Sequence, residues 1–107
     1  MTDAPDDVFE ALSRAEPFLL DRLKSHGIQR IEHVVGFVKP YRIYVWLCTE
    51  TDRQRDAFSK DPFLDEVQAI VVGAGLPTDE AAVVGTAVQS QETVDRDYQG
   101  SWFYALR

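Results

Sequence analysis

The chain has 107 residues, of which 45% are hydrophobic and 27% are charged, and its formal charge at pH 7 is −7. A chain of this size and composition forms one globular domain around a single core, rather than a disordered or membrane-spanning protein. The negative charge disfavours phosphate backbones and anionic lipids, because both attract clusters of Lys and Arg. We therefore expect one soluble domain at residues 1–107 that binds neither nucleic acid nor membrane.

The beginning of the chain, the cysteine content and the arginine usage indicate where the protein works. Residues 1–7 lack the basic and apolar regions of a secretory signal. The single cysteine, Cys48, cannot form an internal disulfide, which is typical of a reducing compartment. Arginines outnumber lysines by 8 to 3 and asparagine is absent, which indicates a bacterial genome with biased composition. These features predict a bacterial cytoplasmic protein.

The first elements along the chain are predicted to be helical. After an acidic segment at residues 1–5, apolar residues recur three and four positions apart from about Asp6, which is the spacing of a helix face. Pro17 fits the first turn of a helix and disrupts an interior, so we expect a break near Ala15 and a restarted helix. Gly27 then provides the left-handed residue that ends a helix.

Residues 28–48 are predicted to form a β-hairpin, because β-branched and aromatic residues dominate them and the periodicity becomes alternating. Pro40 lies between the two strands and is typical of the turn. The polar residues 52–58 have one apolar side and predict a short surface helix, with Thr49 or Thr51 as its cap.

A further helix is predicted from residue 61 to about residue 72, where apolar residues recur on one helical face. The following Gly73-Ala74-Gly75 resembles the glycine turn of a dinucleotide-binding unit. However, Thr78 occupies the third glycine position and no helical pattern follows, so we expect no cofactor. Instead, strands are predicted at residues 81–91 and 101–107, joined by a loop rich in turn-forming residues.

The two halves of the sequence resemble each other. Residues 11–19 return, one residue shorter, as residues 57–64, and each copy leads to a Val-Val-Gly sequence. We interpret residues 6–50 and 51–107 as two αββ repeats. Two such units are expected to form an α+β fold with one four-stranded, mainly antiparallel sheet and the helices on one face. The element order is a circular shift of the ferredoxin-like order.

The predicted strands are apolar on both faces, although helices are available for one face only. Alternation assigns a set of mainly aromatic side chains to the uncovered face, namely Arg42, Tyr44, Trp46, Trp102, Tyr104 and Leu106. A contiguous aromatic patch marks a site for a partner or ligand, and the simplest partner is a second copy in a symmetric homodimer. The alternative is that the N-terminal helix or loops cover this face, which makes these residues part of the core.

The functional hypothesis is a small, acidic, non-enzymatic interaction protein. It self-associates or binds a protein partner through the aromatic sheet face, as an immunity protein, an antitoxin or a chaperone does. The negative charge favours a basic protein partner. The alternative is a protein that binds a small apolar or anionic ligand, in a pocket under the sheet or at a dimer interface, with Arg42 holding an anionic group.

The sequence offers little support for catalysis or metal binding. Cys48 lies in an apolar strand, where a thiol behaves as a small hydrophobe. His33 alternates with Ile31 and Val35, as a residue of a half-buried strand does. Two histidines and a single cysteine do not form a zinc-binding spacing. We therefore predict no catalytic residue and no metal ion.

Overall fold

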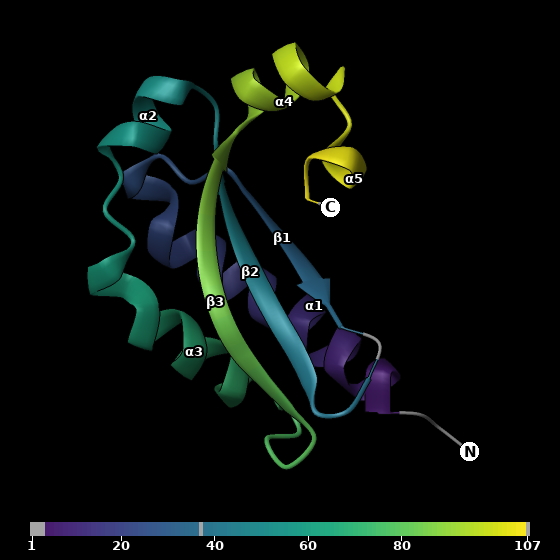
Figure 1. Cartoon of the computed structure of the whole chain (residues 1–107). Coiled ribbons are helices and arrows are strands. Elements are labelled where there is room, and N and C mark those ends of the chain that lie inside the picture. The colour runs from purple at the N-terminus through teal and green to yellow at the C-terminus, as the bar shows by residue number, and fades with distance from the viewer. Residues whose placement is uncertain (1–3, 37, 107) are drawn as a thin grey trace.

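The protein is an α+β domain built on a three-stranded mixed sheet (Figure 1). The computed structural model describes residues 4–36 and 38–106. Strands β1 and β2 form an antiparallel hairpin, and β3 joins β2 in parallel, so the strand order is β1-β2-β3. The elements follow the order α1 (Ala4–Leu23), η1 (Lys24–His26), β1 (Arg30–Val35), β2 (Tyr41–Thr49), α2 (Asp52–Ala57), η2 (Asp61–Phe63), α3 (Leu64–Gly73), β3 (Ala81–Ser90), α4 (Gln91–Tyr98) and α5 (Trp102–Ala105).

Helix α1 begins before the predicted Asp6 and continues through Pro17, so the predicted break near Ala15 is wrong. Its apolar residues lie on one buried face, and this packing holds the helix together although proline removes one backbone hydrogen bond. Gly27 ends the following turn with φ 91°, as the sequence predicted. Residues 1–3 of the predicted acidic segment lie outside the described residues.

The hairpin, the two helices that follow it and the strand at residue 81 are confirmed. Residues of β2 alternate between buried and more exposed from Tyr41 to Trp46, as a strand with one covered face requires. Thr51 caps α2, because its side chain accepts a hydrogen bond from the Gln54 N–H. Pro62 lies in the first turn of η2, directly before α3.

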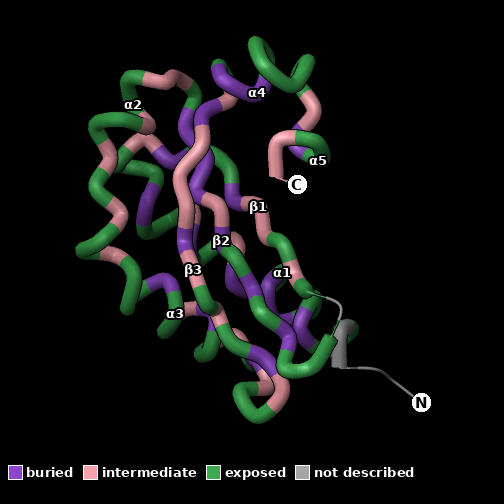
Figure 2. Tube along the Cα trace, in the orientation of Figure 1, coloured by how far each residue is buried: buried purple, intermediate pink, exposed green. Residues whose placement is uncertain are grey.

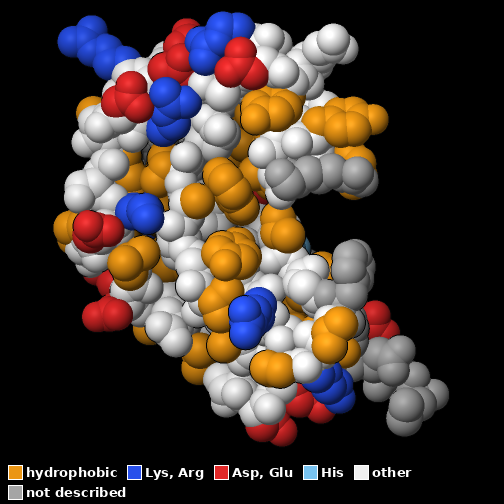
Figure 3. Space-filling view, in the orientation of Figure 1, with side chains coloured by type: hydrophobic (Ala, Val, Ile, Leu, Met, Phe, Trp, Pro, Cys, Tyr) orange, Lys and Arg blue, Asp and Glu red, His pale blue; other side chains and the backbone are white. Residues whose placement is uncertain are grey.

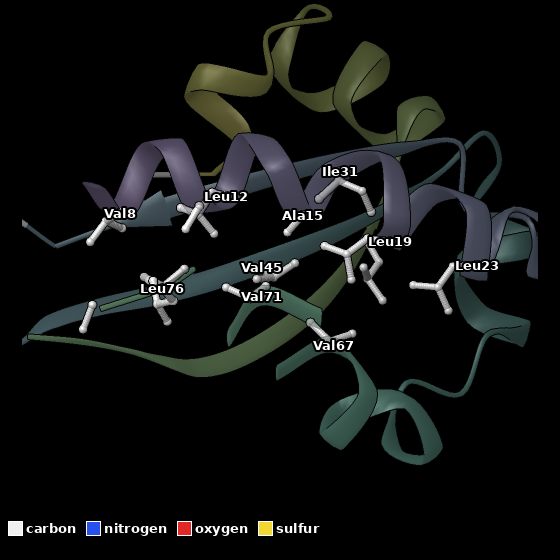
Figure 4. Packing of buried hydrophobic residues seen from close by; sticks show 14 of the residues in the cluster. Val8, Leu12, Ala15, Leu19, Leu23, Ile31, Val45, Val67, Val71 and Leu76 are labelled. Carbon is white, nitrogen blue, oxygen red and sulfur yellow. The ribbon is translucent and has the colours of Figure 1, made fainter. Parts of the chain in front are cut away.

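Helices α1 and α3 cover one face of the sheet and enclose the main core (Figures 2 and 4). Side chains from both helices meet those of β1 and β2 there, and the fully buried ones include Val8, Leu19, Leu23, Ile43, Val45, Leu47 and Val71. Burial of this apolar layer is the main source of the stability of the fold. Among the described residues, no helix combines the length and the apolar character that crossing a bilayer requires.

The predicted four-stranded antiparallel sheet is wrong. The chain from β2 to β3 passes through α2 and α3, so β3 runs parallel to β2 rather than forming a second hairpin. The predicted loop and last strand are instead the helices α4 and α5. Both helices begin at serine caps, because Ser90 accepts a hydrogen bond from the Thr93 N–H and Ser101 from the Tyr104 N–H.

The second half of the chain is therefore not an αββ unit, and the predicted duplication does not describe the fold. Residues 11–19 lie within α1, whereas the similar residues 57–64 cover the end of α2, the turn η2 and the start of α3. Similar local sequences thus adopt different structures, since tertiary packing overrides weak local preferences.

Candidate functional site

The candidate site lies on the face of the sheet opposite α1 and α3. Paired residues on neighbouring strands share a face, so the register identifies the side chains on it. One row across the sheet consists of Val34, Tyr44 and Gly85. The next row, toward the end of β2, consists of Glu32, Trp46 and Ala87.

A C-terminal arm, formed by helices α4 and α5 and the capping residue Leu106 (residues 91–106), folds over one end of this face (Figure 1). Trp102 of α5 is buried and packs with Val94 against Cys48 of β2. The Trp102 Nε1–H donates a hydrogen bond of 2.9 Å to Gln91 Oε1. The guanidinium carbon of Arg30 lies 5.5 Å from the centroid of the Trp102 ring, which is a cation–π distance. The arm thus forms a small second core on this face.

The rest of the face is open, and its exposed side chains, among the described residues, are apolar apart from that of Arg42. Tyr44 and Val84 are each 47% exposed, and Val34 is 36% exposed. Two further aromatic side chains on the arm are also exposed, Phe103 at 63% and Tyr104 at 62%. Figure 3 shows hydrophobic side chains on the arm and along the sheet on this side of the molecule. We call these five residues, Val34, Tyr44, Val84, Phe103 and Tyr104, the open-face patch.

The six residues that the sequence assigned to the site lie on two different elements, strand β2 and the C-terminal arm. Arg42 and Tyr44 lie on the open part of β2, as alternation predicted. Trp46 is half-buried at the margin of the arm, and the other three come from the arm rather than from a strand. Trp102 is buried against the sheet, Leu106 packs beside it, and Tyr104 is exposed. The sequence also allowed that the N-terminal helix or loops cover this face and make its residues part of the core. Trp102 is indeed covered, but the element that covers this end of the face is the C-terminal arm.

A polar cluster that the sequence did not reveal lies at the base of the arm. Asp52, in the first turn of α2, accepts hydrogen bonds from the Ser90 hydroxyl, from the Thr93 hydroxyl at 2.5 Å and from Arg96 Nη1 at 2.8 Å. Arg55 donates to the Thr93 hydroxyl oxygen at 2.7 Å. The cluster joins α2 to the start of α4 and fixes where the arm leaves the sheet.

The chemistry of this cluster is structural. The hydrogen bonds from Ser90 and Thr93, followed by that from Arg96, lower the pKa of Asp52 far below its usual range. A carboxylate that holds its charge so strongly is a poor general base. Ser90 is fully buried, and its hydroxyl donates to this carboxylate. Ser90, a favoured N-cap residue, followed by Glu92 in the first turn is the helix-start signal that sequence reasoning missed.

Of the two residues considered for reactivity, Cys48 is buried and His33 is half-buried. Cys48 has no exposed surface, and burial raises the pKa of its thiol to about 12, so the thiolate that nucleophilic chemistry needs is scarce. Burial lowers the pKa of His33, although Glu32 and Glu16 act in the opposite direction. Its ring lies 6.0 Å from that of Phe9. Within residues 4–36 and 38–106, no three His, Cys, Asp or Glu side chains form a group that could hold a metal ion.

Two surface hollows lie away from the predicted ligand pocket. One of about 620 Å³ is next to His26, Phe58 and Phe63, whose rings lie close together. Another of about 600 Å³ follows β1 and is lined by polar residues that include Glu16 and Arg30. Neither hollow includes Tyr44, Trp46 or Trp102. The alternative hypothesis of a ligand pocket between these rings therefore stays a prediction.

Comparisons with known proteins found no matching family model, no similar curated protein and no similar solved structure.

Proposed function

We propose that the protein is a small, non-enzymatic interaction protein that binds an apolar segment of a partner protein on the open-face patch. The observation that carries the proposal is the set of exposed apolar side chains on three neighbouring strands, namely Val34 and Tyr44, which pair in the register, and Val84 at the bulge of β3, together with the exposed rings of the arm. Its single buried cysteine and its composition favour the cytoplasm of a bacterium as its location.

The size of the patch supports a protein partner. A fully buried aromatic side chain contributes about 150–250 Å², so the exposed parts of Tyr44, Phe103 and Tyr104 hold on the order of 350 Å². A standard interface buries about 800 Å² on each partner. The three rings therefore supply roughly two fifths of such an interface, and aromatic anchors of this kind carry most of the energy of binding.

The charge around the patch favours a segment with basic flanks. The chain carries a net charge of −7, whereas the five residues of the patch are all uncharged. Arg30 and Glu32, which lie beside it, form an ion pair of 2.5 Å and neutralise each other, and Arg42 is the one exposed charge on β2 that adjoins Tyr44. Basic residues that flank an apolar segment are attracted by the rest of the acidic surface, which accelerates encounter.

Self-association through the same face, the other form of the sequence hypothesis, stays a prediction. The arm occupies one end of the face, so the flat surface on which a second sheet could pack is limited to the region around Tyr44. A short extended or helical segment of another protein needs less flat surface than a sheet does. For this reason we place a partner segment, rather than a second sheet, on the open-face patch.

Selection of peptides on the immobilised protein tests the proposal. A library of random peptides is expected to yield apolar sequences with basic flanks. Binding of these peptides should fall at least tenfold for Tyr44→Glu and remain unchanged for Phe18→Glu. Phe18 is a suitable control because it is also aromatic and 65% exposed, but it lies on α1 in the helical layer.

Two outcomes contradict the proposal. In the first, the library yields no peptide above background. In the second, the selected peptides bind Tyr44→Glu as well as they bind the wild type. Light scattering of the wild type and of Tyr44→Glu identifies the remaining case, in which the patch is occupied by a second copy and Tyr44→Glu releases monomers.

A further inference from the structure

We propose that the free edge of β3 is a docking site for a second copy of this chain. In the proposed dimer, two β3 strands pair antiparallel around a twofold axis and join the two sheets into one sheet of six strands. This inference shares only Val84, which lies in β3, with the open-face patch and leaves Tyr44 and the rings of the arm outside the proposed interface.

The first observation is the bare edge of β3. Within the described part of the chain, β2 is its only strand partner, and residues 82–89 make no backbone–backbone hydrogen bond outside that ladder. Alternate N–H and C=O groups of β3 therefore point away from the sheet. Such an edge is a template for pairing with another strand.

The sequence of β3 does not protect this edge. Edge strands are usually short or carry charged residues or proline, which discourage pairing. The six residues of β1, at the other edge, include Arg30, Glu32 and His33. In contrast, the ten residues of β3 contain no charged residue and no proline. A bulge at Val84, between the partners of Ile43 and Tyr44, is the only protective feature of β3 among the described residues.

The second observation is an uncharged stripe on α3 beside this edge. Residues 64, 68 and 72 are four apart and share one side of the helix, and Leu64 is 38% and Val72 40% exposed. Val67 and Val71 point into the core, and Glu66, on another side, binds Arg22 of α1. The stripe therefore faces away from α1. Because α3 lies on the β3 side of the domain, this direction is also that of the β3 edge (Figure 1). It covers one side of the space that a fourth strand occupies.

A second copy fits this surface because the surface is complementary to itself. A twofold axis beside β3 pairs the strand with its own copy and brings the two α3 stripes together, so each exposed Leu64 and Val72 gains an apolar neighbour. Each chain has a charge of −7, which opposes association. The strand and the stripe, Leu64, Gln68 and Val72, carry none of that charge, and the nearest carboxylate on α3 is that of Asp65, which lies three residues before Gln68 at the margin of the stripe.

The area of this edge reaches that of a small dimer interface. The eight residues 82–89 extend about 26 Å at 3.3 Å per residue, and the sheet edge with the adjacent helix side is on the order of 15–20 Å wide. The strip therefore measures roughly 400–530 Å² on each copy, or about 800–1,050 Å² in total. The smallest specific interfaces bury about 1,000 Å².

Oligomeric state and amide exchange together test the proposal. Light scattering of the full chain over a tenfold concentration range is expected to show a dimer. Val72→Lys should raise the dimer dissociation constant at least tenfold, because it places two like charges at the helix contact. In the dimer, the outward-pointing amides of β3 should exchange slowly. In Val72→Lys they should exchange quickly, while the alternate amides bound to β2 remain protected.

Two controls distinguish this site from the open-face patch. Phe18→Lys changes an exposed apolar residue of α1 and should leave the dimer intact. Tyr44→Glu should weaken peptide binding at least tenfold and also leave the dimer intact, so the two proposals can be contradicted independently of each other. A wild type that is monomeric contradicts the proposed dimer. A wild type that is dimeric also contradicts it if Val72→Lys leaves the dissociation constant unchanged and the outward-pointing amides of β3 exchange quickly. Dissociation by Tyr44→Glu alone assigns the dimer to the sheet face instead.

Discussion

The ring of Tyr44 lies against the backbone of Gly85, its partner in the register of β2 and β3. A Cβ atom at residue 85 would stand 2.6 Å from Tyr44 Cε1, closer than such atoms approach in proteins. The missing side chain therefore allows the ring to lie close to β3, and a strand glycine of this kind marks a close approach of its neighbour. Gly85 thus sets the position of the central aromatic residue of the open-face patch.

We expect Gly85→Ala to destabilise the protein by about 1–3 kcal/mol, because the added methyl group displaces the Tyr44 ring. In a Tyr44→Ala background the same change should cost little or stabilise by up to about 0.5–1 kcal/mol, since alanine loses less backbone entropy than glycine. Urea denaturation of the four proteins in this double-mutant cycle measures the coupling. An equal cost in both backgrounds contradicts the assigned contact.

Asp52 is expected to make the stability of the protein depend on pH in the acid range. Its folded pKa is lowered, so it contributes stability fully above its unfolded pKa of about 4 and loses that contribution as the pH falls toward the folded pKa. Asp52→Asn should therefore lower Tm at pH 7 and flatten the fall in Tm between pH 4 and pH 2. Asp56→Asn, a change in an exposed carboxylate of the same helix, is the matched control for thermal unfolding. Parallel acid profiles for the wild type and Asp52→Asn refute this role.

Trp102→Ala is expected to release the arm and expose Cys48. The pKa of Cys48 is about 12, so at pH 8 roughly one thiol in ten thousand is ionised in the native protein. An exposed thiol has a pKa of about 8.5, so labelling with a thiol reagent should accelerate more than about 100-fold in Trp102→Ala. Tyr104→Ala removes an exposed ring from the same helix and should leave the labelling rate unchanged. Slow labelling of Trp102→Ala shows that another element shields the thiol.

Pro17→Ala is expected to stabilise the protein, because alanine restores an N–H that donates within α1 and relieves the clash of the proline ring. Pro17 is exposed, so no core contact is lost. Proline costs about 3 kcal/mol in a helix interior, and the more flexible unfolded chain of the alanine variant offsets about 1 kcal/mol of the gain. A net gain of about 2 kcal/mol is measurable by urea denaturation. An unchanged midpoint indicates that α1 already adapts to the proline.

The local elements from α1 to β3 were largely predictable because each has a clear signal of its own. Alternation identified β1 and β2, a helical face identified α3, and Gly27 marked a helix end. The C-terminal arm lacked such a signal. Residues 101–107 form a short apolar run, and periodicity cannot decide between strand and helix for such a run. Trp102 begins α5 and Leu106 caps it four residues later, and both belong to the cluster that includes Cys48 of β2.

The arrangement of elements depends on contacts between distant residues. Tyr41 pairs with Ala81 across two helices, and no local pattern reveals that β3 runs parallel to β2. The Asp52 carboxylate accepts hydrogen bonds from Ser90 and Arg96, which are 38 and 44 residues away along the chain. Alternation along β2 was therefore sufficient to place Tyr44 on the site, whereas the polar cluster that anchors the arm required the three-dimensional structure.

The packing of the arm on the sheet also determines what tryptophan fluorescence reports in this protein. The chain contains two tryptophans, Trp46 and Trp102, and both lie at the contact between arm and sheet. Emission therefore follows the environment of one local contact, while circular dichroism follows the helices and strands of the whole domain. If the arm detaches before the main core unfolds, the two signals change at different denaturant concentrations, and unfolding is no longer two-state.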